Sequence, residues 1–227
     1  WDDIFTVDRK WVEAFCSRVK YEAPVSWSCN TRVDMVDQEL LKAMKRAGCW
    51  QIHYGIESGS QRLLDLIKKQ ITLEQIENAM RWTRRAGLQT RAYYMLGLPT
   101  ETREESLASI KFIKKIRPSY SMVGLASPYP GTEFAEMVKD ETAAGISWDN
   151  YAVIGGFTGK RRPYLPKGRS SEELNQLQVM AFRNFYLDPR VIFNHLYNIR
   201  TYGEFMRHLR GFFALLMAKV NTKSAFV

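Results

Sequence analysis

Hydrophobic positions along the chain recur first at helical spacing and then as a short apolar run, and this order is repeated. After Asp8, apolar residues at intervals of three and four predict a helix, and the strand VSWSC follows Pro24. After Asp37, the segment QELLKAMKRAG carries its apolar residues on one helical face, ends at Gly48 and leads into the strand WQIHYGI. Each of these units is a helix followed by a strand.

The same order continues through the middle of the chain. Ser60 begins the short helix QRLLDLIKK, and Thr72 with Gln75 forms a capping box for the helix before the strand LQTRAYYML. Thr102 with Glu105 repeats this cap for REESLASIKFIKKI, and the strand SMVGLA follows. Four strands that each follow a helix predict an α/β fold built from parallel βαβ units, either in a barrel or in an open sheet.

The pattern changes after about residue 140. The stretch GGFTGKRRPYLPKGRSS is rich in glycine, proline and basic residues, which is typical of a loop, and Ser170 or Ser171 then begins a mostly helical segment. We therefore expect an α/β part over residues 1–140, a linker over 141–169 and a helical C-terminal extension over 170–227.

Length and composition are those of a globular protein. The chain has 227 residues, of which 45% are hydrophobic and 25% charged, so it can bury a large core. The net charge of +9 favours an anionic partner only weakly, because the basic residues are scattered over helix faces and concentrate only after residue 158. The apolar run GFFALLMA is shorter than the about 20 residues that a membrane-spanning helix needs.

The cysteines indicate the cellular compartment of the protein, and the N-terminus indicates whether the sequence is a fragment. Cys16, Cys29 and Cys49 are widely spaced without a CxxC pair, which indicates neither a disulfide framework nor a zinc site and favours a reducing cytoplasm. His53 has no partner at metal-ligand spacing and is expected to pack inside the fold. The chain shows no signal peptide and does not begin with methionine, so we expect it to be cut from a longer protein.

Candidate chemistry gathers where the predicted strands end, because functional residues of parallel barrels and sheets lie at the C-terminal edge of the strands. The segments at these ends are CNTR at 29–32, GIESGS at 55–60, GLPTET at 97–102 and SPYPGT at 127–132. All four are polar or rich in glycine and proline, as a rim that faces a ligand would be.

Several charged residues at this rim have two interpretations each. Between its glycines, the Glu57 carboxylate can accept hydrogen bonds from ligand hydroxyls, or it can cap the next helix or lie in solvent. Asp2 and Asp3 can interact with the dipole of the first helix, or they can contact a ligand. Arg32 and Lys69 suit a carboxylate or a phosphate, although single basic residues are more often solvated. No nucleophile with an adjacent base, and neither a GxGxxG nor a GxxxxGK[ST] motif, is present.

Taken in order, four segments resemble the radical S-adenosylmethionine (radical SAM) superfamily, particularly its subgroup with a cobalamin-binding domain. These segments are DDIFT, SWSCNTRVDMVDQELLKAMKRAGCWQIHYGIESGSQRLLDLIKK, YYMLGLPTET and PYPGTEF, over residues 1 to about 140. The resemblance implies a partial (β/α)6 TIM-like barrel that binds S-adenosylmethionine against a [4Fe-4S] cluster. It also implies cleavage of that cofactor to a 5′-deoxyadenosyl radical, with methyl transfer through cobalamin as one version of the reaction.

The same resemblance assigns cofactor-binding positions. The residues that it places near the methionine part and the ribose are Asp2 and Asp3 for the amino group, Asn30 and Arg32 facing the cofactor, Glu57 at the ribose and Lys69 at the carboxylate. The residues that it places in the strand-five motif beside adenine are Tyr93, Met95 and Gly97, and those that it places at the strand-six backbone contacts are Ser127, Pro128 and Tyr129.

The chain departs from this superfamily at the cluster. The CxxxCxxC loop that should hold the iron is absent, and the three cysteines have the wrong spacing, so the cluster ligands are expected upstream. We therefore expect a C-terminal fragment, inactive by itself, whose partners are the upstream part of the same polypeptide and a small-molecule or lipid-like substrate. A cytoplasmic location is expected, with peripheral membrane contact through the C-terminal helices as an option; nucleic acid is not favoured.

Two other classes of protein remain open. One is a TIM-like barrel enzyme that holds a divalent metal ion with Asp2, Asp3 and Glu57. The other is a non-enzymatic module whose basic helical tail binds membranes or nucleic acid.

Overall fold

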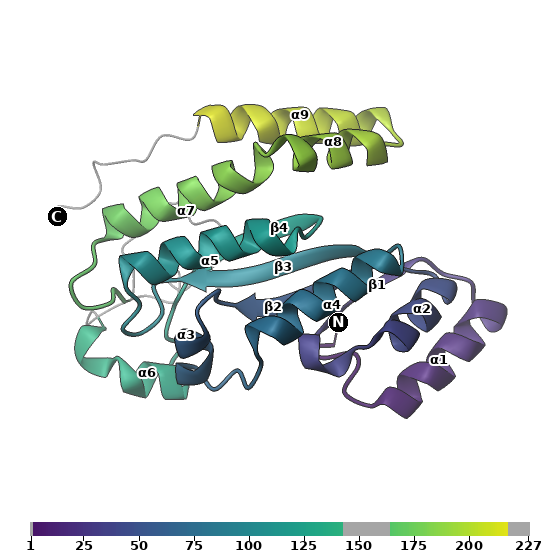
Figure 1. Cartoon of the computed structure of the whole chain (residues 1–227), viewed down its shortest axis with the longest axis horizontal. Helices are drawn as coiled ribbons and strands as arrows, with labels where there is room; N and C mark the ends of the chain where they lie inside the picture. Colours follow the sequence, from purple (N-terminus) through teal and green to yellow (C-terminus); the bar gives the residue numbers. More distant parts are fainter. Residues whose placement is uncertain (1, 143–163, 218–227) are drawn as a thin grey trace. The chain divides into compact units, whose positions relative to one another are not determined.

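The computed structural model describes residues 2–142 and 164–217, whose elements are shown in Figure 1. In the α/β part these are α1 (Arg9–Glu22), β1 (Trp27–Thr31), the 3-10 turn η1 (Val33–Met35), α2 (Gln38–Arg46), β2 (Cys49–Glu57), α3 (Gln61–Leu66), α4 (Leu73–Arg85), β3 (Gln89–Leu96), α5 (Arg103–Ile116) and β4 (Tyr120–Leu125). Beyond β4 they are α6 (Glu133–Met137), η2 (Lys139–Glu141), α7 (Ser171–Tyr186), α8 (Pro189–Asn198) and α9 (Tyr202–Met217).

Strands β1 to β4 form one sheet in chain order, and the pairs β1–β2 and β2–β3 are parallel. This confirms the predicted α/β class. The first strand was predicted two residues too early, because β1 begins at Trp27, whose N–H donates to the carbonyl of Gly48 at 3.2 Å. A long-range hydrogen bond sets the start of β1, and the local apolar pattern VSWSC does not predict that bond.

The described residues fold as two compact units. Of the described residues, the first unit comprises 2–94 and 111–122, and the second comprises 95–110, 123–142 and 164–217. The predicted boundaries near residues 140 and 170 stay a prediction, because residues 143–163, which form most of the expected linker, lie outside the described residues.

The core of the first unit lies between the sheet and helices α2 and α4, which Figure 1 shows beside β1 and β2. The predicted apolar face of α2 is buried, and so are the inward residues of β2 and α4. Tyr54 of β2 is fully buried, and its hydroxyl lies 2.8 Å from Oγ1 of Thr83 in α4. Because burying a large apolar side chain contributes about 1.5–3 kcal/mol, this interface holds β2 firmly.

The N-terminal segment before α1 is anchored by aromatic packing. The ring of Phe5 lies among those of Trp11, Phe15 and Trp27, with centroid separations of 5.4, 5.5 and 5.1 Å. The N–H of Phe5 also donates to the carbonyl of Asn30 in β1 at 2.9 Å. These contacts hold the preceding Asp2 and Asp3 beside the C-terminal end of β1.

In the second unit, α7 packs against the loop that follows β3. Leu174, Leu177 and Phe185 of α7 are buried, and the side-chain amide of Gln178 donates to the carbonyl of Val123 at 3.0 Å. Helices α8 and α9 follow, and α8 has no buried residue. The predicted helical extension is therefore confirmed over the part of it that the structure describes.

Candidate functional site

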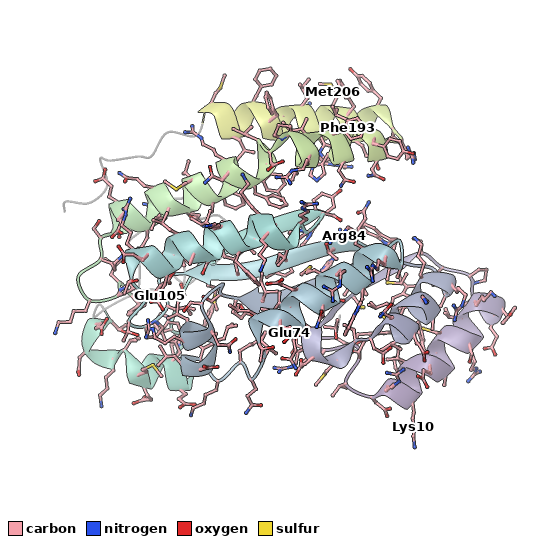
Figure 2. All side chains as sticks on the ribbon, viewed as in Figure 1. Lys10, Glu74, Arg84, Glu105, Phe193 and Met206 are labelled. Carbon is pink, nitrogen blue, oxygen red and sulfur yellow. The ribbon has the colours of Figure 1, made fainter. Side chains whose placement is uncertain are left out.

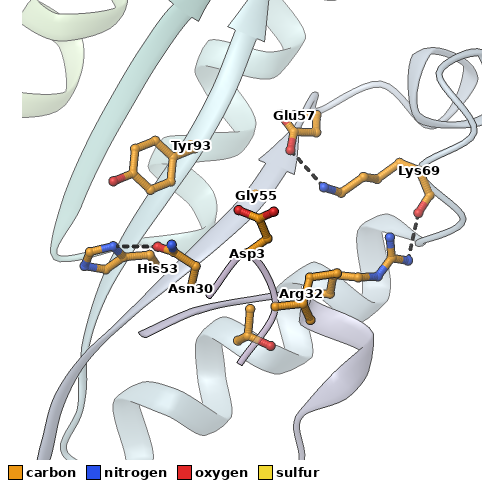
Figure 3. Close-up of a pocket in the computed structure, with 10 residues that line it drawn as sticks. Asp3, Asn30, Arg32, His53, Gly55, Glu57, Lys69 and Tyr93 are labelled. Atoms are coloured by element: carbon orange, nitrogen blue, oxygen red, sulfur yellow. Dashed lines mark hydrogen bonds and ion pairs between the residues drawn. The ribbon is translucent and has the colours of Figure 1, made fainter. Parts of the chain in front are cut away.

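The first unit contains a cavity of about 430 Å³ beside the C-terminal halves of β1 and β2 (Figure 3). Its lining residues are Asp3, Ile4, Asn30, Thr31, Arg32, His53, Gly55, Glu57, Lys69 and Tyr93. Six of the predicted cofactor-binding residues are therefore brought together: Asp3, Asn30, Arg32, Glu57, Lys69 and Tyr93. The volume lies within the range of about 300–1,000 Å³ that is usual for small-molecule sites.

Glu57 is the last residue of β2, and its backbone is turned out of the regular strand. The pairing of β2 with β3 shifts between Gly55 and Glu57, and Glu57 has φ of 58°. For a residue with a Cβ this left-handed conformation costs roughly 1–2 kcal/mol. The bulge aims the carboxylate at Lys69, whose Nζ lies 2.9 Å from Oε1 of Glu57. Both side chains are about one-fifth exposed, at 19% and 21%.

Gly55 leaves the space that this ion pair occupies. A Cβ atom at position 55 would lie 2.5 Å from Oε1 of Glu57 and 3.1 Å from Nζ of Lys69. The first of these distances is shorter than real Cβ contacts allow. A side chain at position 55 would therefore displace the ion pair.

The Lys69 backbone is held on both sides. Its N–H donates to the carbonyl of Leu64 at 2.9 Å, and its carbonyl accepts from Nη2 of Arg32 at 2.9 Å. The residues before and after it, Lys68 and Gln70, have φ of 54° and 55°. Lys69 thus projects from a tight loop whose conformation is specified by hydrogen bonds.

A polar network forms another side of the cavity. His53 Nδ1 lies 3.0 Å from Oδ1 of Asn30, and His53 Nε2 lies 2.8 Å from Oε1 of Gln51. Burial lowers the pKa of His53, and the charge of Arg91 lowers it further, so the imidazole is neutral at pH 7. The amide of Asn30 donates to the carbonyl of Asp2 at 3.3 Å, so Oδ1 of Asn30 is the acceptor for Nδ1–H of His53.

A neutral His53 that donates from Nδ1 must accept at Nε2. The facing amide of Gln51 must therefore present its nitrogen to the ring. The resulting chain of donors runs from Gln51 through His53 and Asn30 to the backbone of Asp2.

His53 was expected to be a packed residue, and the structure shows that it also lines the cavity. The strand period could have indicated this, because His53, Gly55 and Glu57 are two residues apart and face the same side of β2. Its ring lies 6.0 Å from that of Tyr93 on β3, centroid to centroid.

The cavity carries charges of both signs. Figure 3 shows the Asp3 carboxylate pointing into the space between the Glu57–Lys69 pair and the Asn30–His53 pair, with Arg32 at the edge. Such a site suits a ligand that has both a positive and a negative group, together with hydroxyls that a carboxylate can bind. Among residues 2–142 and 164–217, no three His, Cys, Asp or Glu side chains are grouped so that they could hold a metal ion.

The other predicted residues are not among those that line this cavity. Asp2 contributes its carbonyl to Asn30, and the remaining five, Met95, Gly97, Ser127, Pro128 and Tyr129, belong to the second unit. Gly97 has φ of 81°, and a Cβ there would lie 3.1 Å from Cδ1 of Leu174. Packing against α7 and the left-handed backbone therefore explain this glycine, and its cofactor contact stays a prediction.

The loop after Gly97 is organised by a buried carboxylate. Glu101 is 3% exposed; its Oε2 accepts from the N–H of Leu98 at 2.7 Å and its Oε1 from the hydroxyl of Ser106 at 2.7 Å. The carbonyl of Glu101 accepts from Nη1 of Arg169 at 2.9 Å. Burial raises the pKa of Glu101, although these hydrogen bonds oppose the rise. In GLPTET, the glutamate thus has a structural role within the second unit.

Parallel βα units with a charged cavity at the strand ends are the features of α/β barrel enzymes that bind small ligands. Residues 6–113 match the family model for the radical SAM superfamily, and the chain belongs to that superfamily. This confirms the family that the sequence motifs predicted.

Curated relatives extend beyond the residues of this chain. A protein of Pyrococcus horikoshii named as an uncharacterized methyltransferase is 34% identical over 199 residues, which are 86% of this chain and 42% of that protein. The anaerobic magnesium-protoporphyrin IX monomethyl ester cyclase of Cereibacter sphaeroides is 28% identical, over 92% of this chain and 34% of the relative. The chain therefore spans less than half the length of these relatives.

Solved structures share the fold. The radical SAM methyltransferase TsrM of Kitasatospora setae, with cobalamin and a [4Fe-4S] cluster bound, has a TM-score of 0.57 at 15% identity, over 92% of this chain and 50% of that one. The radical SAM enzyme coproporphyrinogen III oxidase of Escherichia coli also has a TM-score of 0.57 at 15% identity, over 78% and 37%. At these identities the likeness shows the fold alone, and it confirms the predicted partial TIM-like barrel.

Proposed function

We propose that the cavity of the first unit binds S-adenosylmethionine, and that the intact protein is a radical SAM enzyme. In that enzyme a [4Fe-4S] cluster supplies the electron that cleaves S-adenosylmethionine to a 5′-deoxyadenosyl radical. The observation that carries the proposal is the Glu57–Lys69 pair, with Asp3 opposite, at the strand ends of a radical SAM domain.

The charges of the cavity match those of the proposed ligand. The Glu57 carboxylate accepts hydrogen bonds from the two ribose hydroxyls, and the Lys69 ammonium donates to the methionine carboxylate. The Asp3 carboxylate accepts from the methionine ammonium. Tyr93 and the neutral His53 provide an aromatic and polar wall beside these groups. Because Glu57 and Lys69 already lie 2.9 Å apart, their binding atoms are placed before the ligand arrives.

The described residues do not fit the iron cluster. Cys16, Cys29 and Cys49 are all buried, and burial raises the pKa of the Cys16 thiol to about 11, which disfavours the thiolate that iron requires. We therefore assign the cluster ligands to the rest of the polypeptide, in agreement with the greater length of the relatives.

Methyl transfer with cobalamin is the version of the reaction that we favour. It is supported by the name of the Pyrococcus horikoshii relative and by the cobalamin bound to the structurally similar TsrM. The substrate that we propose is a small molecule, which includes lipid-like compounds. A cytoplasmic location fits this class of enzyme, and none of the described helices has the length and apolar character needed to cross a membrane.

The test uses the full-length protein, reconstituted with iron and sulfide under anaerobic conditions. We expect one-to-one binding of S-adenosylmethionine and reductant-dependent release of 5′-deoxyadenosine. Glu57→Gln should weaken binding at least tenfold, whereas Glu74→Gln on α4, which removes an exposed carboxylate, should not. Activity that depends on magnesium or manganese and not on iron would instead identify the metal–carboxylate enzyme.

A second candidate function concerns α8 and α9, which expose many large apolar side chains. These are Phe193, Leu196, Tyr197, Tyr202, Phe205, Phe212, Phe213 and Met217, of which Phe193 is marked in Figure 2. Four exposed arginines accompany them: Arg190, Arg200, Arg207 and Arg210. Aromatic side chains beside basic ones suit the surface of an anionic membrane, so we propose peripheral contact there.

This contact is tested by sedimentation of the full-length protein with lipid vesicles. Binding to phosphatidylserine vesicles that weakens with salt, and weakens further in Phe193→Ser, supports the proposal. Tyr21→Ser on α1, which removes a side chain that is 77% exposed, is the matched control and should bind normally. Absence of vesicle binding by the full-length protein would overturn the proposed membrane contact.

A further inference from the structure

Arg32 reaches the loop that carries Lys69. Arg32 follows directly after β1, and its Nη2 lies 2.9 Å from the carbonyl oxygen of Lys69, 37 residues further along the chain. The same guanidinium is oriented by Asp34, with Nε to Oδ1 at 3.0 Å and Nη2 to Oδ2 at 2.9 Å. These contacts engage Arg32 with the protein's own backbone and with a neighbouring carboxylate.

The loop that receives this hydrogen bond needs external support. Lys68 and Gln70 both have left-handed backbones, each of which costs roughly 1–2 kcal/mol for a residue with a Cβ. Gln61 holds the far side of the loop, because its amide donates to the carbonyl of Ile71 at 3.0 Å and accepts from the N–H of Leu73 at 3.1 Å. The part that carries Lys69 is held by Arg32 and by the carbonyl of Leu64.

The position of the Lys69 backbone decides where its ammonium can reach. A lysine side chain has about 2 kcal/mol of rotamer entropy to lose, so an ammonium on a mobile backbone would occupy many positions. With the carbonyl and the N–H of Lys69 both hydrogen-bonded, the side chain extends to Glu57 and to the cavity. Arg32 thus contacts the backbone of Lys69, whereas the Lys69 ammonium is the group that would contact the ligand.

We propose that Arg32 is a positioning residue, which places Lys69 for ligand binding through the Lys69 carbonyl and is itself oriented by Asp34. This inference rests on the proposed function, in which Lys69 binds the methionine carboxylate. It differs from the sequence-based expectation that Arg32 contacts the cofactor directly.

The experiment compares two ligands in the full-length, anaerobically reconstituted protein. S-adenosylmethionine carries the carboxylate, whereas 5′-methylthioadenosine has the same adenine and ribose without the amino-acid part. Lys69→Met should weaken S-adenosylmethionine binding at least tenfold and leave 5′-methylthioadenosine binding unchanged. Arg32→Ala should show the same selectivity, with a loss of about tenfold. The double variant should bind no more weakly than Lys69→Met alone, because both changes remove one interaction.

Arg84→Ala is the matched control. Arg84, marked in Figure 2, also donates to backbone carbonyls in the first unit, those of Ile116 at 3.3 Å and Arg117 at 3.1 Å, and it does not line the cavity. Its removal should leave the affinities for both ligands unchanged. Asp34→Asn, which keeps Arg32 and weakens its orientation, should reduce S-adenosylmethionine binding selectively by a few fold, and it carries the test should Arg32→Ala fail to fold.

The outcomes separate the two proposals. Absence of S-adenosylmethionine binding by the unsubstituted full-length protein would overturn the proposed function. Unchanged S-adenosylmethionine binding in Lys69→Met would overturn the assignment of Lys69 to the methionine carboxylate, and this inference with it. A selective loss in Lys69→Met without one in Arg32→Ala would overturn the positioning role alone. Equal losses for both ligands in Arg32→Ala, or additive losses in the double variant, would also overturn it, because Arg32 would then act on the ligand or on the fold independently of Lys69.

Discussion

Replacing Gly55 by alanine is expected to disturb the cavity while leaving the fold intact. The added Cβ would lie 2.5 Å from Oε1 of Glu57, whereas ordinary contact begins at 3.4 Å, so the carboxylate must move by about 0.9 Å. The second contact, at 3.1 Å, is with Nζ of Lys69. Both atoms are the far ends of flexible side chains, and they can move without displacing the backbone.

The two consequences differ in size. The free energy of unfolding should change by less than about 1 kcal/mol, because the two flexible side chains can move aside and alanine restricts the unfolded chain. A ligand hydrogen bond to a charged group contributes about 1.5–3 kcal/mol, so its loss should weaken S-adenosylmethionine binding by about 10- to 150-fold. Gly55→Ala should therefore separate binding from stability.

Thermal unfolding and equilibrium binding of S-adenosylmethionine to the full-length protein measure these quantities. The control is Gly203→Ala on α9, where a Cβ would meet no atom within 4 Å, and it should change neither. Wild-type affinity in Gly55→Ala would refute the reasoning about close approach. A large loss of thermal stability would show that the methyl group displaces backbone and not the ion pair.

Three further predictions concern the fold. Gly48→Ala should lower the unfolding free energy by at least about 2 kcal/mol more than Gly87→Ala, as measured by denaturant titration. Both glycines are left-handed, but a Cβ at Gly48 would lie 2.2 Å from the carbonyl oxygen of Val25, and one at Gly87 would lie no closer than 3.8 Å to Cε of Lys45. Tyr54→Phe should cost about 1–2 kcal/mol, because it removes the buried hydrogen bond to Thr83, whereas Tyr21→Phe at an exposed site should cost nothing measurable. Burial raises the pKa of Glu101 above its ordinary value of 4.5, so the folded protein holds this proton more tightly than the unfolded chain does. The free energy of unfolding should therefore fall as the pH rises through that raised pKa, by at most about 1.4 kcal/mol per pH unit. Denaturant titrations from pH 4.5 to pH 7 should show a smaller decline in Glu101→Gln, and an unchanged decline would contradict the role of burial.

The elements of the α/β part were largely predictable because parallel βα units leave long periodic signals. The capping box at Thr72 and Gln75 is present as predicted, and its two hydrogen bonds begin α4. The start of β1 was not predictable to the residue, since it depends on the hydrogen bond from Trp27 to Gly48 and on the register with β2. Sequence patterns report local preference, and strand pairing is decided between distant segments.

The candidate site was predictable by residue and not by geometry. Glu57 and Lys69 stood out as charged residues near strand ends, but their pairing depends on left-handed backbones at Glu57, Lys68 and Gln70. None of these is a glycine, so no residue preference indicates the turn. The hydrogen bond from Arg32 to Lys69 joins residues that are 37 positions apart in the sequence, so no local pattern predicts it.

The backbone conformation around Glu57 supports the proposal that this geometry serves a ligand. Of the five non-glycine residues with positive φ in the described part of the chain, three lie between residues 57 and 70. At roughly 1–2 kcal/mol each, their conformations together cost about 3–6 kcal/mol. The hydrogen bonds that hold this loop, from Arg32 and Gln61 and to the carbonyl of Leu64, offset part of that cost at about 0.5–1.5 kcal/mol each. Three left-handed residues gathered around one ion pair at the strand ends therefore motivate the proposal that a ligand binds both charged groups.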